Sequence, residues 1–147
     1  MKIIVDTNIV FSAILNSNSS IPKILIHSPS HFQFYSCSFL NLELLKHRNK
    51  LKKYTKLSDS EIEELVALVT NNITFINEDL LPHKTIHYAV KLVELIDIND
   101  TPFVALTKHL KAKLWTGDKE LANGLLLKGF KDVITTSQLI RLLVNSK

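Results

Sequence analysis

The chain has 147 residues, of which 46% are hydrophobic and 22% charged, with a formal net charge of +4. This length and composition suit a single globular domain over residues 1–147, and the apolar runs are too short for a membrane span. The sequence reaches Asp6 too early for a signal peptide, and its single cysteine, Cys37, excludes a disulfide framework and a thiolate metal cage. We therefore expect a cytoplasmic protein.

Short apolar runs alternate with amphipathic segments along the chain. The predicted elements of the first half are, in order, a strand at 2–5, a helix at 7–16, a helix with Pro22 in its first turn, a strand at 32–35, a helix from about 38 to 54, a helix at 58–70 and a strand at 73–76. Ser58 and Glu61 have the spacing of a capping box at the start of the predicted helix at 58–70.

The second half continues the alternation. Its predicted elements are a helix from Pro82, a helix from Pro102 to 110, a strand at 113–116, a helix after the turn at 117–118, a strand at 133–135 and a last helix to about 145. Strands that alternate with helices indicate an α/β domain with a mostly parallel sheet.

Several common sites are excluded by their missing motifs. None of the three glycines follows the first strand in a dinucleotide or P-loop arrangement, and no GxSxG elbow is present. His83 and His87 have a spacing that zinc ligands use, but without the glutamate of HExxH we interpret them as helix-surface residues.

Three aspartates stand where helices begin. Asp6 and Asp118 follow the first and fourth predicted strands, and Asp100 precedes the helix at Pro102. Each one alone can be interpreted as a helix N-cap. Residues after parallel strands converge on one edge of the sheet, where ligands bind. The three together therefore suggest a site.

Glu43 lies in the predicted helix beside the Leu40–Leu44 stripe. A carboxylate angled toward a core is costly unless a partner offsets its charge, and a divalent cation is one such partner. Several oxygen donors with room for water suit Mg²⁺ or Mn²⁺. The alternative is a boundary residue whose carboxylate reaches solvent.

Residues 46–56, KHRNKLKKYTK, carry six Lys or Arg and no acid. Such a segment either binds a phosphate backbone or forms a solvated helix face. The cations that we expect to guide a nucleic acid are Lys46, Arg48, Lys50, Lys52 and Lys53, with Lys119 beside Asp118.

DTNIV at 6–10, Glu43, DINDTPFVALT at 97–107 and TGDKEL at 116–121 together resemble the sequence blocks of the PIN domain. The resemblance covers nearly the whole chain and is nearest to the branch of toxins related to VapC-type ribonucleases. It implies a three-layer α/β/α domain whose five-stranded sheet has the order 3-2-1-4-5. The first and fourth strands would then be adjacent.

The resemblance also implies an activity. An acidic pocket would hold one or two Mg²⁺ or Mn²⁺ ions and cleave single-stranded RNA to 5′-phosphate and 3′-hydroxyl ends. A toxin of a type II toxin–antitoxin pair would have a small antitoxin protein as its partner, and a homodimer is expected.

By position, the resemblance assigns the acidic residues of the site to Asp6, Glu43, Asp100 and Asp118. It assigns supporting roles to Asn8 and Thr116, and an additional acidic position to Asp97. Asn99 is a departure, because a second acid often stands there. Glu43 has no distinctive flanking sequence.

Two other classes of protein stay open. A phosphoaspartyl phosphatase or a receiver domain also uses an aspartate after its first strand, but the phosphatase pattern expects an acid where Asn8 stands. An inert PIN-fold module that binds RNA or protein would be expected to lack some of the carboxylates.

Overall fold

The computed structural model describes residues 1–146. The strands are β1 (Lys2–Val5), β2 (Gln33–Cys37), β3 (Ile73–Ile76), β4 (Lys113–Trp115) and β5 (Val133–Ile134). The α-helices are α1 (Thr7–Leu15), α2 (Ser20–His27), α3 (Phe39–Lys46), α4 (Arg48–Thr55), α5 (Asp59–Thr70), α6 (His83–Val93), α7 (Thr101–Leu110), α8 (Lys119–Leu127) and α9 (Thr136–Asn145). Two short 3₁₀ helices, η1 (Glu78–Leu80) and η2 (Ile98–Asp100), flank α6.

The five strands form one sheet in the order β3-β2-β1-β4-β5, and every pair is parallel. This confirms the predicted order and the adjacency of β1 and β4. The chain winds outward from β1 in both directions, so the carboxyl edge between β1 and β4 is a topological switch point. In open α/β sheets, ligands bind at such a point.

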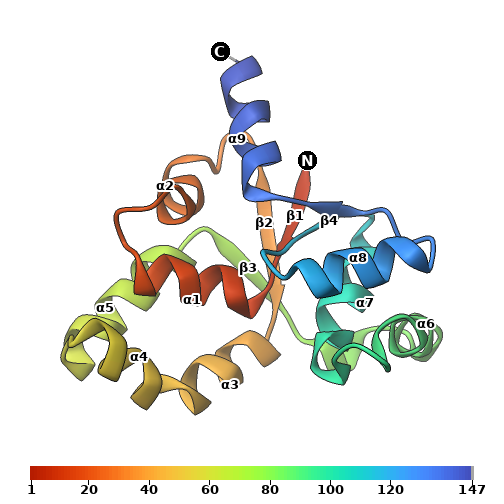
Figure 1. The fold of residues 1–147 in the computed structure, drawn as a ribbon, viewed down its shortest axis with the longest axis horizontal. Helices are drawn as coiled ribbons and strands as arrows, with labels where there is room; N and C mark the ends of the chain where they lie inside the picture. The colour runs from red at the N-terminus through yellow and green to blue at the C-terminus, as the bar shows by residue number, and fades with distance from the viewer. Residues whose placement is uncertain (147) are drawn as a thin grey trace.

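Helices cover both faces of the sheet and make the three layers that were predicted. Helices α1, α2, α4 and α5 lie on one side of the sheet, and α6, α7 and α8 lie on the other (Figure 1). The central strand carries Ile3, Ile4 and Val5, all fully buried, as expected for a parallel strand covered on both faces.

The prediction of one continuous helix from 38 to 54 is wrong, because the structure has two helices there. Helix α3 ends at Lys46, and α4 begins at Arg48 after His47. No glycine or proline marks the break, and Leu40, Leu44 and Leu51 are all buried, so the apolar pattern continues across it. The break turns α4 relative to α3, as the two helices show in Figure 1.

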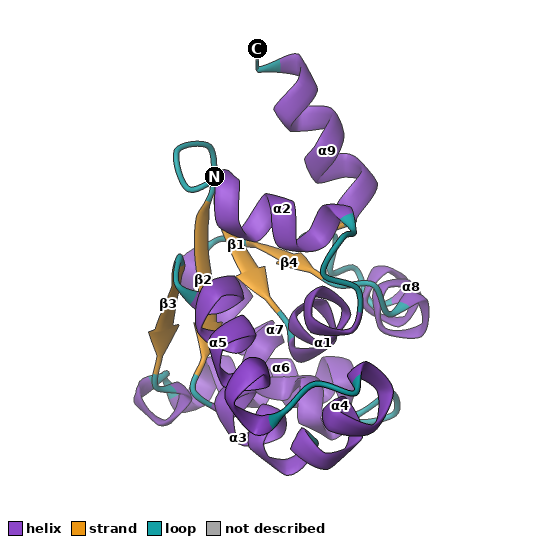
Figure 2. Ribbon diagram, turned by 90° about the vertical axis from the view of Figure 1, so that its left-hand side faces the viewer, coloured by secondary structure: helices purple, strands orange, loops and turns teal. Residues whose placement is uncertain are grey.

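Helix α9 extends away from the body of the molecule beyond α2 (Figure 2). Its start is fixed by a capping box of Thr135 and Gln138 and by a hydrogen bond of 2.9 Å from the indole N–H of Trp115 to Thr136. No helix within residues 1–146 is by itself long and apolar enough to cross a bilayer; α1 and α2 reach that length only together, across a bend of 112°.

Candidate active site

The switch point brings the ends of β1 and β4 side by side. Val5 is paired with Trp115 in the sheet register, so the residues that follow these two strands lie at the same edge. Asp6 follows β1 directly, and Thr116 follows β4, with Asp118 two residues later. The pairing of β1 with β4 therefore explains why Asp6 and Asp118 lie at the same edge of the sheet, as the sequence suggests.

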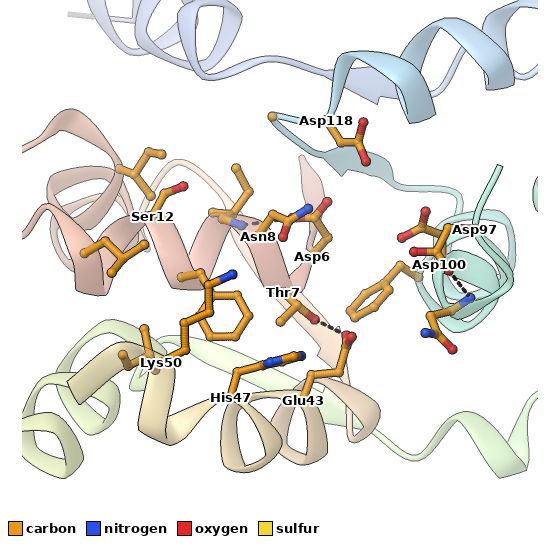
Figure 3. Close-up of a pocket in the computed structure, with 18 of the residues that line it drawn as sticks. Asp6, Thr7, Asn8, Ser12, Glu43, His47, Lys50, Asp97, Asp100 and Asp118 are labelled. Carbon is orange, nitrogen blue, oxygen red and sulfur yellow. Dashed lines mark hydrogen bonds between the residues drawn. The ribbon is translucent and has the colours of Figure 1, made fainter. Parts of the chain in front are cut away.

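A pocket of about 570 Å³ opens at this edge. Its walls include the carboxylates of Asp6, Glu43, Asp97, Asp100 and Asp118. Figure 3 shows that these carboxylates come from different sides of the pocket and surround a shared space. Residues far apart in the sequence thus meet at one place.

Asp6 is almost fully buried, with 3% of its surface exposed. Its Oδ1 atom accepts the backbone N–H of Ile9 at 3.0 Å and so caps α1. The pKa of Asp6 is raised to about 6, mainly by burial and in smaller part by the charges of Asp118 and Glu43, while the hydrogen bonds with Thr116 and the Ile9 N–H act in the opposite direction. A cation beside Asp6 would offset the unfavourable charge.

Asp100, like Asp6, has a raised pKa, and it lies across the pocket from Asp6 (Figure 3). Its pKa is raised to about 7, first by burial and then by the neighbouring charge of Asp97. Its Oδ2 atom is buried and has no hydrogen-bond partner. Asp97 itself is exposed, and its Oδ1 atom accepts the backbone N–H of Asn99 at 3.0 Å, which caps η2.

Asp118 begins α8, where its Oδ1 atom accepts the backbone N–H of Leu121 at 3.1 Å. Its own backbone N–H donates to the hydroxyl of Thr116 at 3.1 Å. Thr116 is itself buried. The N-cap role of Asp6 and Asp118 is therefore compatible with the predicted site role, because a capping aspartate keeps a second oxygen atom.

Glu43 is half-buried on α3, and its Oε1 atom accepts a hydrogen bond from the hydroxyl of Thr7 on α1. This contact holds the carboxylate at the wall of the pocket (Figure 3). The sequence does not predict it, since nothing in the pattern shows which way Thr7 points. Asn8, by contrast, is an exposed residue of the pocket wall.

The chemistry of these side chains fits a hard divalent cation such as Mg²⁺ or Mn²⁺, which takes oxygen ligands. The unpartnered oxygen of Asp100 and the raised pKa values of Asp6 and Asp100 are the features that a bound cation would relieve. Within the described residues, no three His, Cys, Asp or Glu side chains are close enough to share an ion. Direct ligation of one ion by three of these side chains would therefore require them to lie closer together.

The predicted basic residues differ in where their side chains lie. Lys50 lies in the wall of the pocket. Arg48 pairs with Glu63 at 3.0 Å, and Lys52 pairs with Asp59 at 3.2 Å, so both are turned toward α5. The other predicted cations, Lys46, Lys53 and Lys119, are exposed and lie outside the pocket wall.

Several wall residues were not predicted from the sequence. The pocket extends away from the carboxylates between α1 and α4, where its walls include Phe11, Ser12, Leu15, His47 and Tyr54. Their helical spacing could have indicated a shared face. The sequence does not show that this face lines the pocket, because the direction of α4 is set by the break at His47.

Comparison with known proteins identifies relatives of the chain. Residues 4–138 match the family model described as "PIN domain". No curated protein matches the sequence. Among solved structures, the chain is similar to a VapBC2 structure from Rickettsia felis, described as bound to a DNA fragment from the promoter. The TM-score is 0.64 and the identity 20%, over 92% of this chain and 97% of that one, which is a likeness of fold.

Proposed function

Because the chain belongs to the PIN-domain family, we propose that it is a metal-dependent endoribonuclease that cleaves single-stranded RNA. The observation that carries the proposal is the gathering of five carboxylates in one pocket at the switch point of the sheet. A surface that only binds RNA has no use for such a concentration of negative charge, because it repels the phosphates.

Asp6, Glu43, Asp100 and Asp118 are the residues that would hold Mg²⁺ or Mn²⁺, as one or two ions, with Asp97 at the rim. When bound, such an ion supplies Lewis-acid chemistry: it lowers the pKa of water and offsets charge on a phosphodiester. A cation held there would also offset the repulsion between the carboxylates and the RNA backbone.

The other polar side chains of the site have positioning roles in this proposal. The Thr7 hydroxyl fixes Glu43, and the Ile9 N–H fixes one oxygen of Asp6. Thr116 supports the backbone at Asp118. Asn8 lies at the pocket wall, where it can contact the substrate.

The test is RNA cleavage by the wild type and by Asp6→Asn, with Mg²⁺, Mn²⁺ or EDTA. The wild type should cleave single-stranded RNA only with the metal, and Asp6→Asn should be inactive with its circular dichroism unchanged. Full activity of Asp6→Asn would refute the assignment. Calorimetric titration with Mn²⁺ separates an inert PIN-fold module, which should bind the metal poorly.

We propose further that the protein is the cytoplasmic toxin of a type II pair, with a small antitoxin and a homodimeric state. The support is the likeness of fold to the VapBC2 structure and the membership of the PIN-domain family. Expression of the wild type should arrest growth, whereas expression of Asp6→Asn should not. Equal growth of the two strains, with active ribonuclease present in the cells, would contradict the toxin role and leave the ribonuclease proposal intact.

A further inference from the structure

The pocket is far larger than a metal site needs. One water-sized ligand occupies on the order of 10–15 Å³ by the measure of probe-occupied space, whereas this pocket measures about 570 Å³. Small-molecule sites have volumes of roughly 300–1,000 Å³. The extra space lies between α1 and α4, and we call it the α1–α4 groove, with walls of Phe11, Ser12, Leu15, His47, Lys50 and Tyr54.

Resting on the proposed ribonuclease function, we propose that the α1–α4 groove binds one nucleotide of the RNA, adjacent to the phosphate at the carboxylates. The groove would hold the base between its apolar walls and a phosphate against Lys50. The groove would then be the subsite for the nucleotide next to the phosphate at the carboxylates.

The spacing of the wall residues shows that the groove is formed by two whole helix faces. Ser12 and Leu15 lie one and two turns beyond Asn8 on α1, so they continue the face that begins at the carboxylates. Lys50 and Tyr54 lie one turn apart on α4. The groove is therefore continuous with the carboxylate pocket, as a path for a single strand has to be.

The groove also has the surface character that a base needs. Tyr54 is 64% exposed and Leu15 is 47% exposed, although both line the pocket. Phe11 packs its ring edge-on against His47, with 5.7 Å between the ring centroids, and this pair forms an aromatic part of the groove wall. Aromatic faces bind bases of single-stranded nucleic acids by stacking.

The positively charged residues of α4 differ in their surroundings, and this difference favours an anion in the groove. Arg48 and Lys52 are paired with Asp59 and Glu63 on α5. Lys50 makes no ion pair within the described residues and lies in the groove wall, facing the pocket in Figure 3. A nucleotide fits both the aromatic wall and Lys50, since it carries a base with flat faces and an anionic phosphate a short distance apart.

The experiment measures binding of a short, fluorescently labelled single-stranded RNA by anisotropy, in the Asp6→Asn background with Mg²⁺ so that no RNA is cut. Tyr54→Ala should weaken binding about fivefold or more, the low end for loss of one stacked base, and Tyr54→Phe should bind as the parent does. Lys50→Met should reduce the slope of log Kd against log salt by about 0.7.

Matched controls use residues outside the groove. Tyr88→Ala removes another exposed tyrosine, on α6, and Lys131→Met removes an exposed lysine ahead of β5; neither should change binding. Equal Kd values for Tyr54→Ala and Tyr88→Ala would overturn the proposal, and so would the absence of saturable binding by the parent.

Cleavage assays on the same variants without the Asp6 change separate the two proposals. If the wild type fails to cleave RNA but Tyr54→Ala still weakens binding, the ribonuclease proposal fails and the groove is a nucleotide site. If the wild type cleaves and Tyr54→Ala binds and cleaves identical sequences at identical rates, the groove proposal alone fails.

Discussion

The hydroxyl of Thr7 donates a hydrogen bond to the carboxylate of Glu43, and this contact joins the first turn of α1 to α3 at the pocket wall. Thr7 directly follows Asp6, so one short segment positions two of the acidic residues. The weakest assignment from the sequence, Glu43, thus has a specific structural partner.

Thr7→Val should lower the affinity for Mn²⁺ by about tenfold, in the range found when partners of metal-binding side chains are removed. The reason is that Glu43 would lose the hydroxyl that fixes its carboxylate. Thr7→Ser keeps the hydroxyl and should restore most of the affinity. Calorimetric titration measures both, and equal affinities for Thr7→Val and the wild type would show that the contact has no part in metal binding.

Asp6→Asn should stabilise the metal-free protein by about 1–3 kcal/mol at pH 7.5, because burial raises the pKa of Asp6 to about 6 and penalises the charged form. Asparagine keeps the oxygen that accepts the Ile9 N–H, so the cap of α1 is retained. Chemical denaturation in EDTA measures the change. Lower stability of Asp6→Asn would mean that the charge is already offset.

The thiol of Cys37 should react with a disulfide reagent at pH 8 only as fast as the protein unfolds. The side chain is fully buried, and burial raises its pKa from 9.0 to about 12. Below pH 9 the thiol is neutral in both states. As the pH rises from 9 toward 12, the unfolded chain ionises first, so the free energy of unfolding should fall. Cys37→Ala should lack this part of the pH dependence.

Thr136→Val should lower the free energy of unfolding by about 1–3 kcal/mol, because it leaves the N–H of the buried Trp115 without its partner. Trp115 is the single tryptophan, so its fluorescence reports the change without interference. Thr136→Ser should be close to the wild type. Equal stability of the valine and serine variants would contradict the prediction.

Arg48→Ala should change the free energy of unfolding by less than about 1 kcal/mol, since its ion-pair partners Asp59 and Glu63 are exposed to solvent. The salt dependence of RNA binding should also stay unchanged, in contrast to Lys50→Met. Anisotropy and denaturation on the same preparations measure the two effects. A reduced salt slope for Arg48→Ala would show that the ion pairs open to admit RNA.

The features that could be predicted from the sequence are those that depend on residues close together in the chain. The strand at 2–5, the capping box of Ser58 and Glu61, and the start of a helix after Asp118 are confirmed, since each is determined by neighbours in the chain. The order of the strands was predicted by resemblance and is confirmed. The proposed roles of the acidic residues stay predictions.

The features that the sequence did not predict depend on distant contacts. The break at His47 has no glycine or proline signal, because it is set by how α3 and α4 pack on α1. That break decides that Lys50 faces the pocket while Arg48 and Lys52 face α5. From sequence alone, the cations of residues 46–56 are indistinguishable.

Helix α4 has consequences for how this chain can diverge. One face is tied to the core by Leu51 and to α5 by Arg48 and Lys52, and substitutions there act on folding. The other face, with Lys50 and Tyr54, contacts the pocket and carries little of the packing. On the groove proposal, substitutions at residues 50 and 54 would therefore change how the protein binds a nucleotide while the acidic residues and the core stay as they are.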